Sequence, residues 1–158
     1  MISKVQCLDI LPMKVIALRG EPNTGKTHTL RKVHQLMLKM GFQQVPGTYE
    51  DHGNGDFLDV LEFNGRRVGI VSQGDYAKNH KTALSVGALL GRLQEMGCEI
   101  AICACTIGES KGRIQEAINA YTEHVYIEKQ KANSPDDYEE VNTRDAKIIL
   151  SILMEMLG

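Results

Sequence analysis

The stretch Gly20-Glu21-Pro22-Asn23-Thr24-Gly25-Lys26-Thr27 matches the pattern G-x-x-x-x-G-K-[ST] at every fixed position. The glycines allow backbone angles that other residues avoid, so the loop can turn its N–H groups inward around an anion. Lys26 would add a positive charge near the β- and γ-phosphates, and the Thr27 hydroxyl would ligate Mg²⁺. His28 follows directly; it is a further candidate for contact with the ligand or takes an ordinary position in the helix. The pattern therefore predicts a loop that binds a triphosphate together with Mg²⁺.

The residues on either side of this loop have the patterns of a buried strand and an amphipathic helix. Residues 13–19 form a short apolar run that is partly β-branched, as in a buried parallel strand. After the loop, apolar residues recur at helical spacing, and Gly41 is placed to end that helix. These apolar residues are Leu30, Val33, Met37 and Met40. Strand, glycine-containing loop and helix thus follow in the order that phosphate binding requires, and the helix directs its positive end at the site.

In these residues the chain resembles the P-loop NTPases. The resemblance is specific over residues 13–41 and looser as far as about residue 128. It implies one nucleotide-binding domain over residues 1–158, with Mg²⁺ as cofactor and ATP or GTP as ligand. It also implies that residues 20–28 contact the nucleotide and that Lys26 takes part in catalysis.

The rest of the chain alternates between strand and helix patterns. Residues 43–56 contain glycines and a proline with little periodicity, which predicts a long loop. Residues 57–63 and 66–72 predict an antiparallel hairpin, because the Asn64-Gly65 pair between them favours a type I′ turn. Further helices are expected at about residues 82–96, 114–121 and 144–157, and further strands at 99–105 and 125–128. The alternation predicts a three-layer α/β fold: a mostly parallel sheet, helices on both faces and an antiparallel edge hairpin.

Asp75 is the candidate carboxylate on the metal side of the site. Ligands of open α/β sheets bind at the carboxyl ends of the strands, and Asp75 follows the strand at residues 66–72. It resembles the second acidic motif of the P-loop NTPases, which implies roles in Mg²⁺ binding and catalysis. That motif places its aspartate directly after the apolar run, whereas Ser72, Gln73 and Gly74 come between here. Asp75 could therefore be a turn residue instead, with Ser72 and Gln73 facing the metal or its waters.

Other polar residues near the expected site give weaker signals. Thr48, in the predicted loop, could close on Mg²⁺ as a switch residue, or it could be a solvated loop residue. Lys111 and Arg113 follow a strand on the expected active side, where they could clamp a phosphate or form an ordinary helix start. Residues 43–56 occupy the place where related NTPases have a switch, so we expect them to become ordered when Mg²⁺ and triphosphate bind.

The detailed signatures of the small GTPases are missing, although the order of the elements is similar to theirs. Their D-x-x-G motif would need glycine at position 78, where this chain has Lys78. Their guanine-binding [N/T]-K-x-D motif would fall at residues 106–109, which read Thr-Ile-Gly-Glu. The sequence therefore favours ATP over GTP.

Composition and charge restrict the partners and the compartment. The chain has 158 residues and a formal net charge of −2, which gives no indication of nucleic-acid binding. No apolar run approaches the length of about 18 residues that a membrane span needs, and residues 1–12 lack the pattern of a signal peptide. We therefore expect a cytoplasmic protein without membrane contact. The four cysteines lack zinc-site spacing and are expected to be buried thiols.

Three functions are compatible with these features. The first is hydrolysis of the triphosphate, slow on its own and stimulated by a protein partner that supplies an arginine. The second is a small-molecule or nucleotide kinase that uses the same loop; its lid often carries several arginines, whereas residues 106–115 contain only Lys111 and Arg113 as basic residues. The third is a nucleotide-dependent module that binds a partner with little turnover. Stimulation by a partner, or transfer of phosphate to a small acceptor, would discriminate between them.

Overall fold

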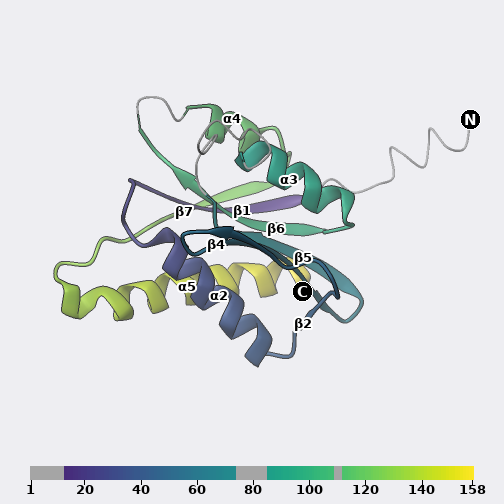
Figure 1. The fold of residues 1–158 in the computed structure, drawn as a ribbon, viewed down its shortest axis with the longest axis horizontal. Coiled ribbons are helices and arrows are strands. Elements are labelled where there is room, and N and C mark those ends of the chain that lie inside the picture. Colours follow the sequence, from purple (N-terminus) through teal and green to yellow (C-terminus); the bar gives the residue numbers. More distant parts are fainter. Residues whose placement is uncertain (1–12, 74–84, 109–111) are drawn as a thin grey trace, which may run out of the picture.

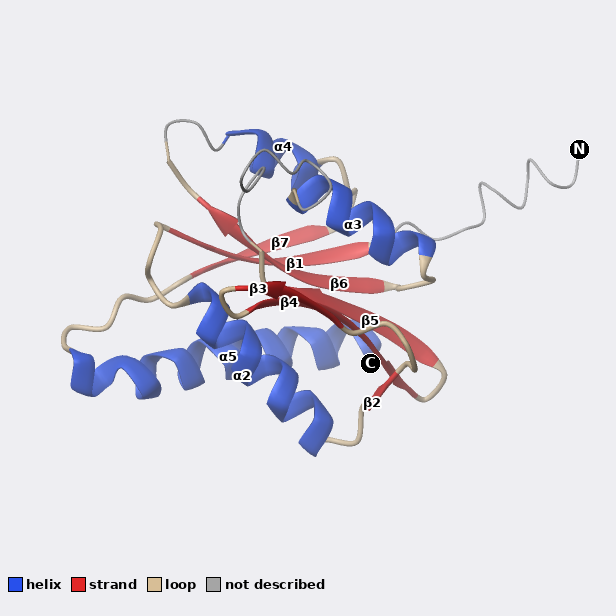
Figure 2. Cartoon of the chain, in the orientation of Figure 1, coloured by secondary structure: helices blue, strands red, loops and turns tan. Residues whose placement is uncertain are grey.

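The computed structural model describes residues 13–73, 85–108 and 112–158, which form a mixed α/β fold (Figures 1 and 2). Among these residues, seven strands make one sheet in the order β2-β4-β5-β6-β1-β7, with β3 paired to β4. The expectation of an α/β fold with a mostly parallel sheet is confirmed. In the same residues, no helix is both long enough and apolar enough to cross a membrane.

Four neighbouring strands form the parallel part of the sheet. They are β1 (Lys14–Gly20), β5 (Arg66–Val71), β6 (Ile100–Thr106) and β7 (His124–Glu128). Strand β1 lies between β6 and β7, and its last residue, Gly20, pairs with Thr106 at the end of β6. Residues 15–18 have no exposed surface, because helices cover both faces of this strand, and this explains their continuous apolar run.

Strand β4 (Asp56–Phe63) begins the antiparallel part of the sheet. It pairs with β5 through a turn at Asn64 and Gly65, whose φ angles are +53° and +76°. These positive angles suit the predicted type I′ turn. The predicted hairpin is therefore confirmed, and β5 continues into the parallel part beside β6.

The prediction of a long loop over residues 43–56 is wrong. This segment contains β2 (Gln43–Gln44) and β3 (Glu50–Gly53), and both pair with β4. Residues 53–55 all have positive φ angles and make a second tight turn, between β3 and β4. Strand β3 carries mostly polar side chains, so it lacks the alternation of apolar residues by which strands are recognised.

Two pairs of helices cover the two faces of the sheet (Figure 2). Helices α2 (Lys26–Lys39) and α5 (Tyr138–Leu157) lie on one face, and α3 (Val86–Glu95) and α4 (Gly112–Asn119) lie on the other. Each face has its own apolar core. Leu30 and Ile149 belong to the core under α2 and α5, whereas Leu89 and Ile118 belong to the other.

Helix α5 is longer than its apolar pattern predicts. That pattern placed the start near residue 144, but the helix begins at Tyr138, after the 3₁₀ turn η2 (Pro135–Asp137). The additional residues include Asn142, and Asp145 lies just after the predicted start; both are polar and yet buried. Buried polar residues look like surface positions in a hydrophobicity pattern, so the apolar pattern does not reach the first turns of α5. The sequence signal for this start is the run from Ser134 to Asp137, which has the residue types of a helix N-cap with proline at the first helical position, and η2 begins there.

The cysteines of the described residues are buried, as the sequence predicted. Cys98, Cys103 and Cys105 are free thiols in or beside β6. Burial raises the pKa of Cys98 to about 12 and that of Cys105 to about 11. Such thiols stay protonated and act as small apolar side chains. Cys7 lies outside the described residues.

Candidate functional site

The loop between β1 and α2 turns through residues with positive φ angles and leads directly into the open end of the helix. Gly25 precedes the helix with a φ angle of +94°, and Asn23 has a φ angle of +61°. The first helical hydrogen bond runs from Thr29 N to Gly25 O at 2.9 Å. The N–H groups of residues 26–28 come before that bond, so they belong to the open, positive end of α2.

Lys26 lies across this loop. Its ammonium donates to Gly20 O at 3.1 Å and to Glu21 O at 2.6 Å, and the residue is largely buried. The loop is closed further by a hydrogen bond from Thr24 Oγ1 to Glu21 O at 2.8 Å. The arrangement holds a positive charge at the carboxyl end of β1, where the sequence pattern placed it.

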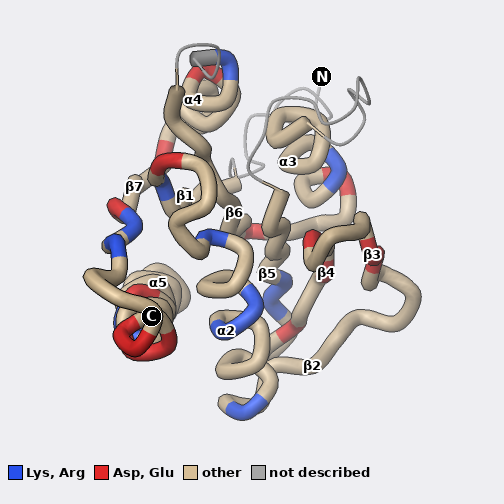
Figure 3. Tube along the Cα trace, turned by 60° about the vertical axis from the view of Figure 1, so that its left-hand side comes forward, with Lys and Arg blue, Asp and Glu red and all other residues tan. Residues whose placement is uncertain are grey.

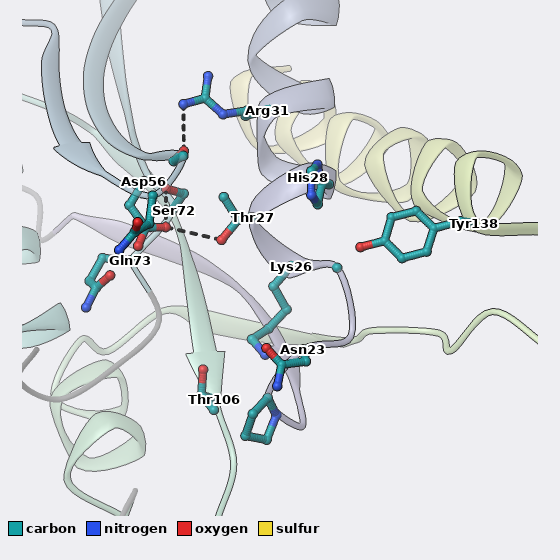
Figure 4. Close-up of a pocket in the computed structure, with 14 residues that line it drawn as sticks. Asn23, Lys26, Thr27, His28, Arg31, Asp56, Ser72, Gln73, Thr106 and Tyr138 are labelled. Carbon is teal, nitrogen blue, oxygen red and sulfur yellow. Dashed lines mark hydrogen bonds between the residues drawn. The ribbon is translucent and has the colours of Figure 1, made fainter. Parts of the chain in front are cut away.

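A cavity of about 420 Å³ opens in front of this loop and the start of α2 (Figure 4). Of the sequence-predicted residues, those that line it are Pro22, Asn23, Gly25, Lys26, Thr27 and His28. Gly20, Glu21 and Thr24 belong to the loop but not to the cavity lining. Residues from distant parts of the chain complete the lining: Arg31, Asn54, Gly55, Asp56, Ser72, Gln73, Thr106 and Tyr138. The cavity therefore combines the predicted loop with side chains from outside that loop.

A carboxylate that was not among the predicted site residues lies beside Thr27 (Figure 4). Thr27 Oγ1 donates to Asp56 Oδ1 at 3.1 Å, and Ser72 Oγ donates to the same oxygen at 3.0 Å. Ser72 Oγ in turn accepts a hydrogen bond from Phe57 N at 2.9 Å, which fixes the hydroxyl. Asp56 is 8% exposed, so its carboxylate is enclosed yet borders the cavity. These contacts bring two hydroxyl groups and a carboxylate together beside the Gly20–Thr27 loop.

Asp56 was missed because its segment was assigned to a loop. Asn54-Gly55 comes directly before the apolar strand, and it is the same turn signal as Asn64-Gly65 at the other end of that strand. With that signal, a second hairpin would have been predicted and Asp56 placed at the first position of β4.

Asp75, the predicted metal-side carboxylate, lies outside the described residues, as does Lys111. Ser72 and Gln73, the alternatives considered beside Asp75, both line the cavity. Strand β6 lies between β5 and β1, so the strand that precedes Asp75 is not the neighbour of the loop-bearing strand. The neighbour of that strand is β6, and Thr106 lies at its end.

Thr48 lies in a different polar cluster, around Asp59. Its hydroxyl is 3.1 Å from Asp59 Oδ1, while Gln44 Nε2 donates to Asp59 Oδ2 at 2.6 Å and His34 Nε2 lies 2.8 Å from it. Burial alone would raise the pKa of Asp59, but these hydrogen bonds bring it below its ordinary value. Neither Thr48 nor Arg113 is among the residues that line the cavity.

The oxygen atoms near Thr27 are of the type that Mg²⁺ prefers as ligands. No group of three or more His, Cys, Asp or Glu side chains in the described ranges could hold a metal ion alone. Mg²⁺ commonly takes only about one or two carboxylates and completes its shell with waters and phosphate oxygens. The Thr27 hydroxyl and the Asp56 carboxylate are hard oxygen ligands of this kind, and Ser72 orients the carboxylate.

No protein-family model matches the chain, and no curated protein matches it. Among solved structures, the one described as "Crystal structure of APE1195" is similar to it, with a TM-score of 0.42 and 15% sequence identity. The similarity covers 92% of this chain and 73% of the other. Similarity at this level does not indicate a function.

Proposed function

We propose that this chain binds a Mg²⁺–nucleoside triphosphate at residues 20–28 and hydrolyses it, as a small P-loop NTPase with a three-layer fold. The observation that carries the proposal is the position of Lys26 and Thr27 at the open end of α2, facing a cavity that Asp56 borders. ATP is the expected substrate, because Lys78 and residues 106–109 depart from the GTPase motifs.

The loop offers the groups that a triphosphate needs. The N–H groups at the start of α2 would donate to phosphate oxygens. Lys26 would turn from the carbonyl oxygens of Gly20 and Glu21 to the β- and γ-phosphates, since its ammonium already lies at the loop. A positive charge held there stabilises the negative charge that shifts during phosphoryl transfer.

Thr27 and Asp56 are the residues that would hold Mg²⁺. Their oxygens are in hydrogen-bond contact at 3.1 Å, and the ion would replace that contact. When bound, Mg²⁺ would supply positive charge that offsets the negative charge of the phosphates. Asp75 remains a second candidate ligand, as a residue outside the described ranges.

A kinase activity is the second candidate, and the outer end of the cavity favours it. Arg31 Nη2 donates to Gly55 O at 2.6 Å, and the guanidinium carbon lies 5.0 Å from the centre of the Phe57 ring. Arg31 and Asn54 border the same cavity as the phosphate loop. An acceptor molecule with a negative group could lie between this arginine and the terminal phosphate.

Product analysis tests the proposal. With Mg²⁺ and ATP, the purified chain should release ADP and inorganic phosphate in equal amounts, and Lys26→Ala should abolish turnover. Lys39→Ala, an exposed position at the end of the same helix, is the matched control and should have no effect. ADP without inorganic phosphate in the presence of an acceptor would select the kinase. Binding of ATP with no ADP formed would contradict hydrolysis.

A further inference from the structure

Strand β7 forms one margin of the sheet. Figure 3 shows the strands side by side, with β7 at that margin and helices α4 and α5 on opposite faces of the sheet. Within the described ranges, β1 is the only strand that pairs with β7, so the other side of β7 has no neighbouring strand. An unpaired side of this kind presents main-chain N–H and C=O groups that can pair with a strand of another molecule.

The hydrogen bonds to β1 show which residues of β7 turn their main-chain groups outward. Val15 N donates to Glu123 O at 3.0 Å, and Lys129 N donates to Arg19 O at 2.7 Å. Residues 123 and 129 therefore face β1, and so do the odd-numbered residues between them, because main-chain groups alternate between the two sides of a strand. The residues that direct N–H and C=O groups away from the sheet are therefore His124, Tyr126 and Glu128.

The side chains of these three outward residues lie on one face of the sheet, because side chains alternate between the two faces. The His124 ring meets the Tyr126 ring edge-on at 5.7 Å, and the Arg19 guanidinium carbon lies 4.3 Å from the centre of the Tyr126 ring. Arg19 Nε donates to Glu128 Oε2 at 2.8 Å, and the Tyr126 hydroxyl donates to Asn119 Oδ1 of α4 at 2.6 Å. These contacts draw the Tyr126 and Glu128 side chains over β1 and towards α4 rather than across the outer side of β7.

The sequence of β7 is complementary to itself in the antiparallel direction. When Tyr126 of one copy lies opposite Tyr126 of another, His124 lies opposite Glu128 and Val125 lies opposite Ile127. The first pair brings an imidazole to a carboxylate, and the second brings two apolar side chains together on the other face of the sheet. Each pair occurs twice, because an antiparallel pairing of identical strands is symmetric.

This register also uses every outward group of β7. In an antiparallel ladder, two residues whose main-chain groups point at each other exchange both of their hydrogen bonds. With Tyr126 at the centre, all three outward residues of one copy meet outward residues of β7 in the other copy. Any other register that pairs outward residues leaves at least one of the three beyond the end of the opposite strand.

The other margin of the sheet is less suited to such pairing. It consists of β2, which has two residues, and of β3, whose register on β4 shifts between Asp51 and Gly53. Short edge strands and irregular pairing hinder the addition of a further strand. The observations therefore favour β7 as the margin that accepts one.

We propose that β7 pairs in the antiparallel direction with β7 of a second copy of this chain, with the two Tyr126 residues opposite each other at a two-fold axis. The two sheets then form one continuous sheet through the interface. No residue of β7 lines the cavity in front of the phosphate loop, so the pairing does not use the proposed nucleotide site and does not depend on the proposed function.

Sedimentation of the wild-type chain and of two charge variants tests this inference. The wild-type chain should form a reversible dimer. His124→Glu puts a carboxylate opposite Glu128 of the other copy and should raise the dimer dissociation constant by about tenfold, because two pairs change from attraction to repulsion. His124→Lys keeps opposite charges at the same exposed position, so it is the matched control and should dimerise at least as tightly as the wild type.

Cysteine cross-linking tests the register, and it also serves if His124→Glu does not fold. Opposed residues of this kind have Cα atoms about 5.5 Å apart, which is within the range that a disulfide spans. With an added oxidant, Tyr126→Cys should form a disulfide-linked dimer. His124→Cys should not, because the two copies of residue 124 lie at opposite ends of the paired strands. The wild-type chain, which has four cysteines of its own, gives the background.

Two results would overturn the inference. One is a wild-type chain that sediments as a monomer up to its solubility limit, which would leave this margin to a strand of another protein or to none. The other is a dimer that His124→Glu and His124→Lys affect equally, or that Tyr126→Cys does not cross-link, which would mean that the copies meet elsewhere. Nucleotide binding by such a chain would leave the proposed function standing.

Discussion

Asp56 presents its carboxylate to Thr27 from the first position of β4. An asparagine there keeps the shape but lacks the negative charge that Mg²⁺ binding needs. We expect Asp56→Asn to lower the Mg²⁺-dependent part of the ATP affinity by about 1.5–3 kcal/mol. The affinity measured without Mg²⁺ should stay nearly the same. Calorimetric titration in magnesium and in chelator separates the two parts.

Two further aspartates serve as comparisons for this result. Asp51→Asn makes the same change at an exposed position of β3 and should leave both affinities unchanged. Asp75→Asn tests the carboxylate that the sequence motif selected. If Asp56→Asn loses the same ATP affinity with and without Mg²⁺, Asp56 has a structural role. If only Asp75→Asn loses the Mg²⁺-dependent part of the affinity, Asp75 is the metal ligand.

The ionisation of Asp59 makes the free energy of unfolding depend on pH in the acid range. Its pKa is lowered below the ordinary value of 3.8, because its hydrogen bonds outweigh the effect of burial. A carboxylate with a lower pKa in the folded state stabilises the fold above its unfolded pKa, and this contribution is lost as the pH falls through the folded pKa. We expect urea unfolding to show a loss of stability below about pH 4, and Asp59→Asn to reduce that loss.

The same substitution has an expected effect at neutral pH. There Asp59→Asn should lower the free energy of unfolding by about 1–3 kcal/mol, because His34, Gln44 and Thr48 lose an ionised acceptor. The exposed Asp51→Asn should change neither the neutral stability nor the acid dependence. If Asp59→Asn loses as much stability in acid as the wild type does, Asp59 is not the source of the acid dependence.

At the scale of the elements, α3 rests directly on Gly69 of β5. A Cβ at this position would lie 2.6 Å from Leu93 Cδ2 and 2.9 Å from Leu93 Cγ, and Leu93 is fully buried. Close packing leaves Leu93 little room to move, so Gly69→Ala should destabilise the fold by about 1–3 kcal/mol. Denaturant unfolding measures this change.

Gly91→Ala is the matched control for Gly69→Ala. Gly91 lies within α3, and no atom beyond its chain neighbours and its own helix backbone comes within 4 Å of the place where its Cβ would be. Alanine forms helix better than glycine by about 0.8–1 kcal/mol, so this variant should be at least as stable as the wild type. Similar free energies of unfolding for Gly69→Ala and Gly91→Ala would show that α3 is not closely packed on β5 at Gly69.

The β3–β4 turn is the element that should respond to the ligand. In residues 43–52, Val45 N donates to Val60 O at 2.9 Å and β3 pairs with β4, so we expect slow hydrogen exchange there without ligand. In the turn at residues 53–56, Arg31 binds Gly55 O and Thr27 binds Asp56, and Mg²⁺–ATP would break the second contact. The hydrogen-exchange rate of the peptide over residues 53–57 should therefore differ between the free chain and the chain with Mg²⁺–ATP bound. Fast exchange over residues 43–52 that slows with ligand would instead support the loop predicted from sequence.

At the scale of the whole molecule, features with local signals were predicted well. The turn at Asn64-Gly65 carries its own conformational preference, and so does the order of strand, loop and helix around residues 20–27. The structure places both as the sequence indicated.

Features that depend on distant pairing could not be predicted in the same way. The position of β6 between β5 and β1 follows from packing over the whole sheet, and no local sequence pattern in β6 indicates it. The contact between Thr27 and Asp56 joins residues that are 29 positions apart. The burial of Asn142 and Asp145 depends on Thr29 and Lys129, and only the first of these partners lies far away in the sequence.

The affinity of Mg²⁺–ATP for the wild-type chain and for Lys26→Ala, measured by calorimetry, tests the proposed phosphate site most directly. The wild type should bind, and Lys26→Ala should bind more weakly by about 1.5–3 kcal/mol, the usual contribution of a hydrogen bond to a charged group. Its unfolding curve should resemble that of the wild type, and Lys39→Ala should match the wild type in both measurements. A folded Lys26→Ala with unchanged affinity, or a wild-type chain that binds no nucleoside triphosphate, would contradict phosphate binding at residues 20–28.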